Sequence, residues 1–216
     1  MKIIKQMWFV FFMIGIVSFY GCFGQEIQKR KAVIIIDPGH GGKDSGAIRI
    51  GGHKEKELVL EVALKMLKWN KILLNNRYDI YLTRYTDTLI SLSDRAKLAG
   101  VLRADLFISL HGNDANNPKA KGIEVFVHSS VKGKRENGKL AIKIATNIIK
   151  QLNEKLGYRS RGLKKANFQV LRQTISTCPS VLVELGFLSN QDDADYITKK
   201  ESINAVALAI LMSIKI

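Results

Sequence analysis

Three apolar segments of the chain are each followed closely by a side chain that can bind a metal ion or transfer a proton. The three side chains are His40, His111 and Glu184, and they follow the apolar runs at 33–36, 106–110 and 181–183. Runs of branched apolar residues are typical of strands covered on both faces of a parallel sheet. Because the carboxyl ends of parallel strands lie at one edge of the sheet, we expect these side chains to meet in one shallow site.

The carboxylate is the most informative of the three groups. At the end of a buried strand a carboxylate is costly unless it is paired, bound to a metal or protonated, so Glu184 either forms an ion pair or has a function. His40 stands in a glycine-rich turn, where a single histidine is often an ordinary surface residue. The coincidence of three such groups at three strand ends favours a functional site.

A third metal ligand has to come from another element. A catalytic zinc site uses three protein ligands and keeps a fourth position for water, so two histidines leave the set one ligand short. His53, Glu55 and Glu57 lie at the start of the first expected helix, and all three are chemically acceptable. Acidic residues at a helix start also favour the helix dipole. The spacing alone does not choose between these residues.

Strands and helices alternate along the chain in one expected domain. Apolar residues at spacings of three and four predict helices over 59–73, 91–102, 141–156 and 203–214. Further strands are expected over 78–83, 123–127 and 168–171, and loops over 43–54 and 159–165. The segment Ser91–Asp94 resembles a capping box that opens a helix. This order predicts a single three-layer α/β/α domain with a mostly parallel central sheet.

Several segments resemble the zinc-dependent N-acetylmuramoyl-L-alanine amidases of bacterial cell walls. The similarity covers essentially all of residues 32–214, in the family's order. The segments are VIIIDPGHGGKDSG at 33–46, EKELVLEVALK at 55–65, LTR at 82–84, SLSDR at 91–95, DLFISLHGN at 105–113, RGLKKANFQVLR at 161–172 and VLVELGFLSN at 181–190. Agreement in several separate segments is far more specific than any single motif.

The resemblance implies one Zn²⁺ ion bound by His40, Glu55 and His111, and it implies that Glu184 is the catalytic carboxylate. The implied reaction is hydrolysis of the amide bond between the lactyl group of N-acetylmuramic acid and L-alanine of the stem peptide in peptidoglycan. In that reaction Glu184 would take a proton from the attacking water and return it to the leaving amine.

Further roles are expected from charge and position. Stem peptides carry free carboxylates, so Asn113, Arg172 and the basic loop around Lys164 and Lys165 are expected substrate contacts. Asp37 is expected either to orient a histidine through its free ring nitrogen or to hold the turn. Some members of the family carry a long insertion with a helix that plugs the site. Here Gly112–Lys139 is short and polar, so we expect no built-in plug and no activator that removes one.

The first residues have the layout of a secretory signal peptide, with two lysines, an apolar run over 7–19 and small residues before Gln25. We expect residues 1–24 to be a signal peptide, 25–31 a linker and 32–216 the catalytic domain, exported to the periplasm or cell envelope. Cleavage before Cys22 would instead give a lipoprotein, and an uncleaved segment would be an anchor. Both alternatives would attach the protein to a membrane.

The chain is strongly basic, with 34 Lys and Arg against 19 Asp and Glu and a net charge of +15. This charge indicates a polyanionic partner such as nucleic acid, an anionic membrane surface or an acidic wall polymer. The expected export and the lack of a basic-aromatic recognition motif disfavour nucleic acid. Peptidoglycan is the expected partner of a monomeric protein. The alternatives are a zinc peptidase acting on other peptides and a non-catalytic protein that binds or regulates peptidoglycan.

Overall fold

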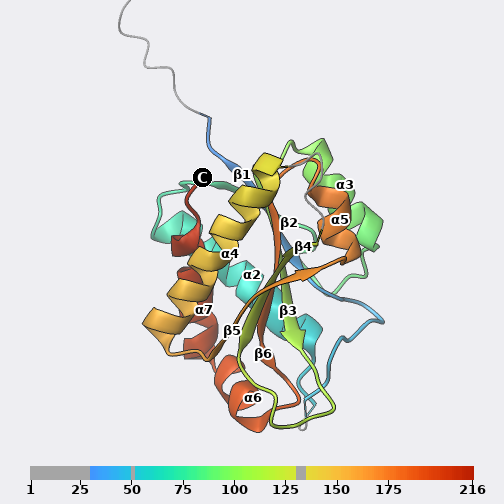
Figure 1. The fold of residues 1–216 in the computed structure, drawn as a ribbon, viewed down its shortest axis with the longest axis vertical. Coiled ribbons are helices and arrows are strands. Elements are labelled where there is room, and N and C mark those ends of the chain that lie inside the picture. The colour runs from blue at the N-terminus through green and yellow to red at the C-terminus, as the bar shows by residue number, and fades with distance from the viewer. Residues whose placement is uncertain (1–29, 50–51, 130–134) are drawn as a thin grey trace, which may run out of the picture. The chain divides into compact units, whose positions relative to one another are not determined.

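The computed structural model describes residues 30–49, 52–129 and 135–216, and Ala32–Ile216 form one compact unit (Figure 1). The expected signal peptide and most of the expected linker lie outside the described residues. Within these three ranges, no helix combines the length and the apolar character needed to cross a membrane.

A six-stranded sheet runs through this unit in the order β2-β1-β3-β6-β4-β5. Its strands are β1 (Val33–Pro38), β2 (Asp79–Leu82), β3 (Leu106–Asn113), β4 (Ile123–His128), β5 (Ser160–Ala166) and β6 (Ser180–Phe187). Neighbouring strands are parallel except β4 and β6, which pair antiparallel. The prediction of a single α/β domain with a mostly parallel sheet is confirmed.

Helices cover both faces of the sheet, as Figure 1 shows. One face carries the larger apolar core and the helices α2 (Glu55–Ile72), α4 (Arg135–Leu156) and α7 (Lys200–Ser213), with α6 (Gln191–Ile197) following β6. The other face carries a smaller core and the helices α3 (Leu92–Val101) and α5 (Gln169–Thr174), which pack against each other. The unit therefore has three layers, as expected.

The apolar run of β1 follows from its place between two other strands. Ile34 and Ile36 belong to the larger core and Ile35 to the smaller one, so the strand is buried on both faces. In contrast, the edge strand β2 alternates exposed and buried residues. Because β1 is buried on both faces, its sequence is a continuous apolar segment, which ends at the site.

Two expected elements are wrong, and one helix was not expected. The expected strand over 168–171 is the beginning of α5, because a segment this short fits a strand or a buried helical turn equally well. The expected loop over 159–165 contains β5, whose polar sequence SRGLKKA suits an edge strand, where lysines oppose pairing with other chains. The unexpected helix is α6, which is only seven residues long.

The expected N-cap at the start of α3 is present, although the described residues show no reciprocal bond from the Ser91 backbone N–H to Asp94 that would complete a capping box. The Ser91 hydroxyl accepts a hydrogen bond from the Asp94 backbone N–H at 3.1 Å and donates one to Asp94 Oδ2 at 2.6 Å. These bonds satisfy an N–H group that the helix itself leaves unpaired. They fix the end of α3 that faces the strand ends.

Candidate metal centre

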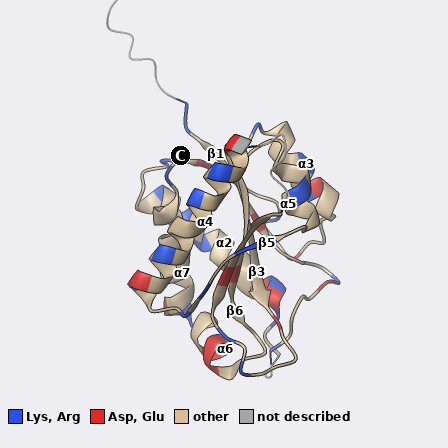
Figure 2. Cartoon of the chain, viewed as in Figure 1, with Lys and Arg blue, Asp and Glu red and all other residues tan. Residues whose placement is uncertain are grey.

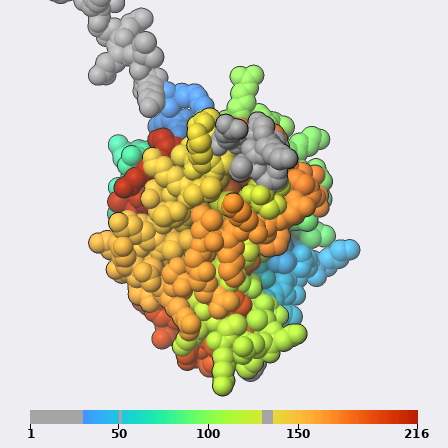
Figure 3. Space-filling model, in the orientation of Figure 1, coloured from blue at the N-terminus to red at the C-terminus, as the bar shows by residue number. Residues whose placement is uncertain are grey.

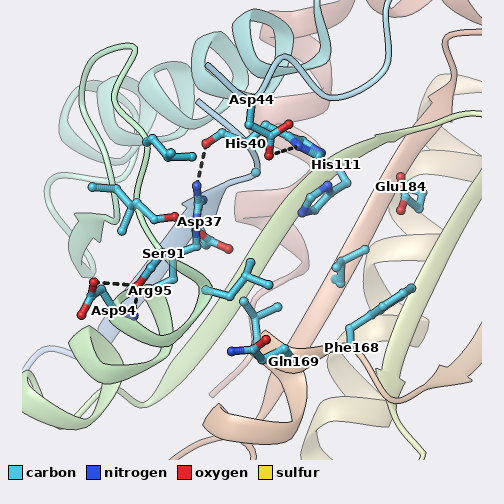
Figure 4. Close-up of a pocket in the computed structure, with 16 residues that line it drawn as sticks. Asp37, His40, Asp44, Ser91, Asp94, Arg95, His111, Phe168, Gln169 and Glu184 are labelled. Atoms are coloured by element: carbon cyan, nitrogen blue, oxygen red, sulfur yellow. Dashed lines mark hydrogen bonds and ion pairs between the residues drawn. The ribbon is translucent and has the colours of Figure 1, made fainter. Parts of the chain in front are cut away.

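Three adjacent parallel strands bring the expected side chains together. His111 at the end of β3 pairs in register with Glu184 of β6, and β1 ends two residues before His40. Glu55, the first residue of α2, is 3% exposed and completes the group. Figure 4 shows His40, His111 and Glu184 arranged along the same edge of the sheet.

Glu55 lies between the two histidines. Its Oε1 is 3.0 Å from His40 Nε2 and 2.9 Å from His111 Nδ1, and the Gly112 backbone N–H donates to the same oxygen at 3.0 Å. The ligand atoms of the three side chains lie within 4.8 Å of one another. Two nitrogen donors and one oxygen donor around a common point are typical of a catalytic metal site. The group therefore fits a single metal ion.

The loop that carries His40 wraps tightly around these ligands. A Cβ on Gly39 would lie 2.3 Å from Cε1 of the His111 ring, and a Cβ on Gly46 would lie 2.4 Å from Glu55 Oε2. His40 itself has φ 57°, which is uncommon outside glycine and typical of functional sites. Gly39 and Gly46 are therefore required because the backbone of the loop passes so close to His111 and Glu55.

Asp44 orients His40. Its Oδ2 lies 2.9 Å from His40 Nδ1, which leaves Nε2 facing Glu55. A carboxylate on the second ring nitrogen fixes the tautomer of a metal-binding histidine and raises its basicity. Asp37, a candidate for this role from the sequence, instead contacts Arg95, Thr83 and Ser109.

We predict that Asp44→Ala lowers the affinity for Zn²⁺ by about 10–100-fold, because losing such an outer contact typically has that effect. Competition between the protein and a fluorescent zinc chelator would measure it. Asp192→Ala is the matched control, since Asp192 is an exposed carboxylate bonded to Lys121 on another part of the surface. Equal affinities of Asp44→Ala and Asp192→Ala would show that Asp44 does not support the site.

Two buried arginines hold the backbone of the His40 loop. Arg84 donates from Nη2 to the Gly39 carbonyl at 2.8 Å, and Arg95 donates from Nη2 to the His40 carbonyl at 2.6 Å. Arg95 also forms a buried ion pair with Asp37, with Nη1 2.7 Å from Oδ1. Asp37 therefore holds the turn, which is the second of its two expected roles, and contacts no histidine.

The electrostatics of the centre favour a bound cation. The hydrogen bond to Glu55 and the contact with Asp44 raise the pKa of His40 to about 9, against the opposing effect of burial. Burial raises the pKa of Glu55, but hydrogen bonds to His111 and His40 outweigh it and hold that pKa well below its usual range. An ionised Glu55 thus attracts a proton to His40. A metal ion binds the same groups by releasing that proton.

Glu184 lies beside the three ligands rather than among them. Its Oε2 is buried and has no hydrogen-bond partner among the described residues. Burial raises the pKa of Glu184 to about 7; His111 opposes this rise, and the neighbouring carboxylates Glu55 and Glu124 add to it. A carboxylate with such a pKa can accept and return a proton near neutral pH.

Two hollows meet at the group of His40, Glu55 and His111, which we call the metal group. Both hollows are lined by His40, His111 and Glu184. The larger, of about 740 Å³, extends toward α3 and α5 and has apolar side chains that include Leu92, Phe168 and Leu182. Figure 4 shows Phe168 and Gln169 on its far side. The smaller, of about 420 Å³, is lined by residues 46–47 and 112–114. An extended substrate can lie across the metal group with one part in each hollow.

The expected substrate contacts Asn113 and Arg172 lie in different places. Asn113 lines the smaller hollow and donates from Nδ2 to Glu124 Oε2 at 3.0 Å. Arg172 lines a separate hollow with Ser93 and donates to the Asn167 carbonyl at 3.0 Å. The structure brings Asn113 to the metal group and leaves Arg172 away from it, so the contact of Arg172 with substrate stays a prediction.

Sequence reasoning missed four residues that support the site: Asp44, Arg84, Arg95 and Glu124. Two of them carried a usable signal. Asp44 follows His40 by four residues in the same loop, and Glu124 interrupts an apolar strand just as Glu184 ends one. Arg84 and Arg95 end two of the segments that resemble the family, but nothing in these segments indicates that the arginines bind backbone carbonyls.

Comparisons with known proteins agree with this geometry. The family model Amidase_3, N-acetylmuramoyl-L-alanine amidase, matches residues 34–215. The chain is 37% identical over 177 residues to an endolysin of Bacillus phage SPP1, covering 81% of this chain and 62% of the endolysin. It is 32% identical over 218 residues to the N-acetylmuramoyl-L-alanine amidase AmiA of Escherichia coli K12, covering 83% of this chain and 74% of AmiA.

A similar structure has also been solved. The catalytic domain of CwlV, an N-acetylmuramoyl-L-alanine amidase from Bacillus (Paenibacillus) polymyxa var. colistinus, superimposes with a TM-score of 0.71 at 33% identity. The match covers 84% of this chain and 95% of that domain. The chain thus corresponds to nearly a whole catalytic domain, while it spans less than two thirds of the phage endolysin.

Proposed function

The chain belongs to the Amidase_3 family of N-acetylmuramoyl-L-alanine amidases, and from this premise we propose that it is a zinc-dependent amidase of peptidoglycan. It hydrolyses the amide bond between the lactyl group of N-acetylmuramic acid and L-alanine of the stem peptide. The observation that carries the proposal is the convergence of His40, Glu55 and His111 next to Glu184, whose carboxylate remains outside the ligand group.

Zinc is the proposed metal because two imidazole nitrogens and one carboxylate oxygen suit it. When bound to His40, Glu55 and His111, it would lower the pKa of a water molecule and polarise the substrate carbonyl. Asp44 and the clamped loop hold His40 in its ligating orientation.

Glu184 moves the proton in the proposed reaction. Its carboxylate takes a proton from the attacking water as the new C–O bond forms. It then gives that proton to the nitrogen of L-alanine as the C–N bond breaks, so that the peptide leaves as an amine. Burial beside the metal group gives Glu184 a pKa of about 7, which suits both transfers. The reaction needs no nucleophilic side chain.

Cell-wall amidases act in the cell envelope, and we propose that residues 1–24 direct export to it. The mature protein then contains residues 25–31 as a linker and 32–216 as the catalytic domain, unless cleavage before Cys22 attaches a lipid. Mass spectrometry of the mature N-terminus distinguishes these forms. Retention of residues 1–24 would contradict cleavage.

Digestion of purified sacculi by the purified chain tests the proposed function. We expect free stem peptides and glycan strands with intact lactyl groups, loss of both products in a chelator, and recovery with Zn²⁺. We also expect activity without any partner protein, because residues 114–122 between β3 and β4 contain no helix that could act as a plug. Cleavage of a peptide bond within the stem would indicate a peptidase. Binding without release of peptide would indicate a regulatory protein.

A further inference from the structure

The row of functional side chains across the sheet continues beyond Glu184. His111 of β3, Glu184 of β6 and Glu124 of β4 are partners in register on adjacent strands. Side chains of such partners point to the same face of a sheet, with about 4.8 Å between strands. Glu124 therefore lies one strand spacing from the proposed proton carrier, on the side away from the metal ligands.

The next strand brings two cations to Glu124. Ile123 pairs with Ser160 and Val125 with Leu163, so β5 contains an extra residue at this point. Gly162 allows the bulge with φ +85°. Bulges redirect side chains, and here both Arg161 and Lys164 reach the same face.

Both cations bind the same carboxylate oxygen. Arg161 Nε and Lys164 Nζ each lie 2.5 Å from Glu124 Oε1, and Asn113 donates to Oε2. Figure 2 shows blue segments of β5 beside the acidic centre of the sheet. One carboxylate balances only one of the two positive charges, so the cluster carries a surplus positive charge.

The surplus charge faces solvent at the edge of the site. The side chains of Arg161 and Lys164 are 34% and 39% exposed, whereas that of Glu124 is 5% exposed. The segment around β5 forms part of the surface seen in Figure 3. The Arg161 guanidinium lies 5.1 Å from the centre of the Phe187 ring, and among the described residues its hydrogen bonds use Nε alone. Its outer N–H groups remain available to an anion.

A stem peptide has an anion at a suitable distance from its scissile bond. The α-carboxylate of the second residue lies up to about 6 Å from the nitrogen of L-alanine in an extended chain. This length is close to the spacing between β6 and β4, which separates Glu184 from Glu124. Both cations contact the Glu124 carboxylate. A planar guanidinium beside an ammonium is well suited to a carboxylate.

We propose that Arg161 and Lys164, held by Glu124, form a subsite that binds the free α-carboxylate of the second stem-peptide residue. The inference rests on the proposed function and deepens it by naming the part of the substrate that the protein recognises. Glu124 and Asn113 are positioning residues in this subsite. The subsite distinguishes stem peptides with a free carboxylate from those in which it is amidated.

Two soluble muramoyl tripeptides that differ only in amidation of this α-carboxylate test the proposal. We expect the wild-type protein with Zn²⁺ to cleave the free form with a kcat/KM about tenfold higher than the amidated form, mainly through KM. Arg161→Gln should remove most of this preference, mainly by raising KM for the free form. Lys164 still pairs with Glu124 in that variant, so the buried Glu124 carboxylate keeps a cationic partner.

Arg159→Gln is the matched control. It removes the same charge two residues earlier, from a side chain that lines a different hollow with Asp192 and Tyr196, so it should keep the tenfold preference. A wild-type protein that cleaves both substrates equally, or an Arg161→Gln variant with unchanged preference, would overturn the subsite.

Calorimetry with the two released tripeptides separates this inference from the proposed function. If neither muramoyl substrate is cleaved, the amidase proposal fails, and the subsite is judged by binding alone. Tighter binding of the free tripeptide by the wild-type protein but not by Arg161→Gln supports it. Equal binding of both tripeptides to both proteins overturns it.

Discussion

Glu184→Gln should lower kcat for amide hydrolysis by about 10²–10⁴-fold, the usual contribution of a group that transfers a proton in the transition state. Glutamine keeps the shape of the side chain but cannot accept the proton of the attacking water. Because Glu184 lies outside the group of His40, Glu55 and His111, the affinity for Zn²⁺ should stay within a few-fold of wild type. The measurements are release of stem peptides from sacculi and zinc competition on the same preparation.

The stability of this variant tests whether unfolding causes its inactivity. Burial raises the pKa of Glu184 to about 7 from 4.5, so the native state binds more protons than the unfolded state between these values. Stability is therefore lost as the pH rises from about 4.5 to 7. In a chelator at pH 8, Glu184→Gln removes this cost, and we expect its unfolding free energy to exceed that of wild type by roughly 1–3 kcal/mol. A smaller difference is expected at pH 5.

Either of two results would contradict the role of Glu184. Retention of more than a tenth of wild-type kcat would exclude it as the proton carrier. Loss of zinc binding together with activity would make it a ligand or a support of the ligand group. Glu57→Gln is a suitable control, because Glu57 is an exposed acidic residue near the start of α2 outside the metal group.

The site residues that follow central strands could be predicted, because a strand buried on both faces has a continuous apolar sequence. His40, His111 and Glu184 each follow a run of apolar residues, and the parallel order of β1, β3 and β6 brings these strand ends together. The third ligand could not be chosen from spacing. All three candidates, His53, Glu55 and Glu57, are acceptable ligand types. Which of them points toward the sheet depends on the path of the preceding loop.

The edge of the sheet and the support of the site were harder to predict. β5 has no apolar alternation because none of its residues is fully buried, so its polar sequence predicts a loop. Arg95 lies on the buried face of α3, a position where periodicity predicts an apolar residue. A buried arginine is explained only by its partners, which come from distant parts of the chain.

Arg95→Met should destabilise the protein by about 3–5 kcal/mol, the usual cost of leaving one member of a buried ion pair without its partner. Arg95 is 2% exposed and Asp37 is 1% exposed. Thr83 and Ser109 also donate to the Asp37 carboxylate, at 2.6 and 2.8 Å, but neither neutralises its charge. Urea unfolding in the presence of a chelator measures the stability of the fold without the contribution of bound metal.

A double-mutant cycle with Asp37→Asn tests whether the pair acts as a unit. Asparagine removes the charge and keeps an acceptor for Thr83 or Ser109, so the double variant should be less destabilised than the sum of the two single variants by about 1–3 kcal/mol. Lys97→Met, an exposed change on the same helix, should change stability by no more than about 0.5 kcal/mol. Additive costs would mean that the two residues are not coupled. In that case Arg95 would stabilise the fold through its bonds to the carbonyls of Pro38 and His40, and the zinc affinity of Arg95→Met would fall even where Asp37 is neutral.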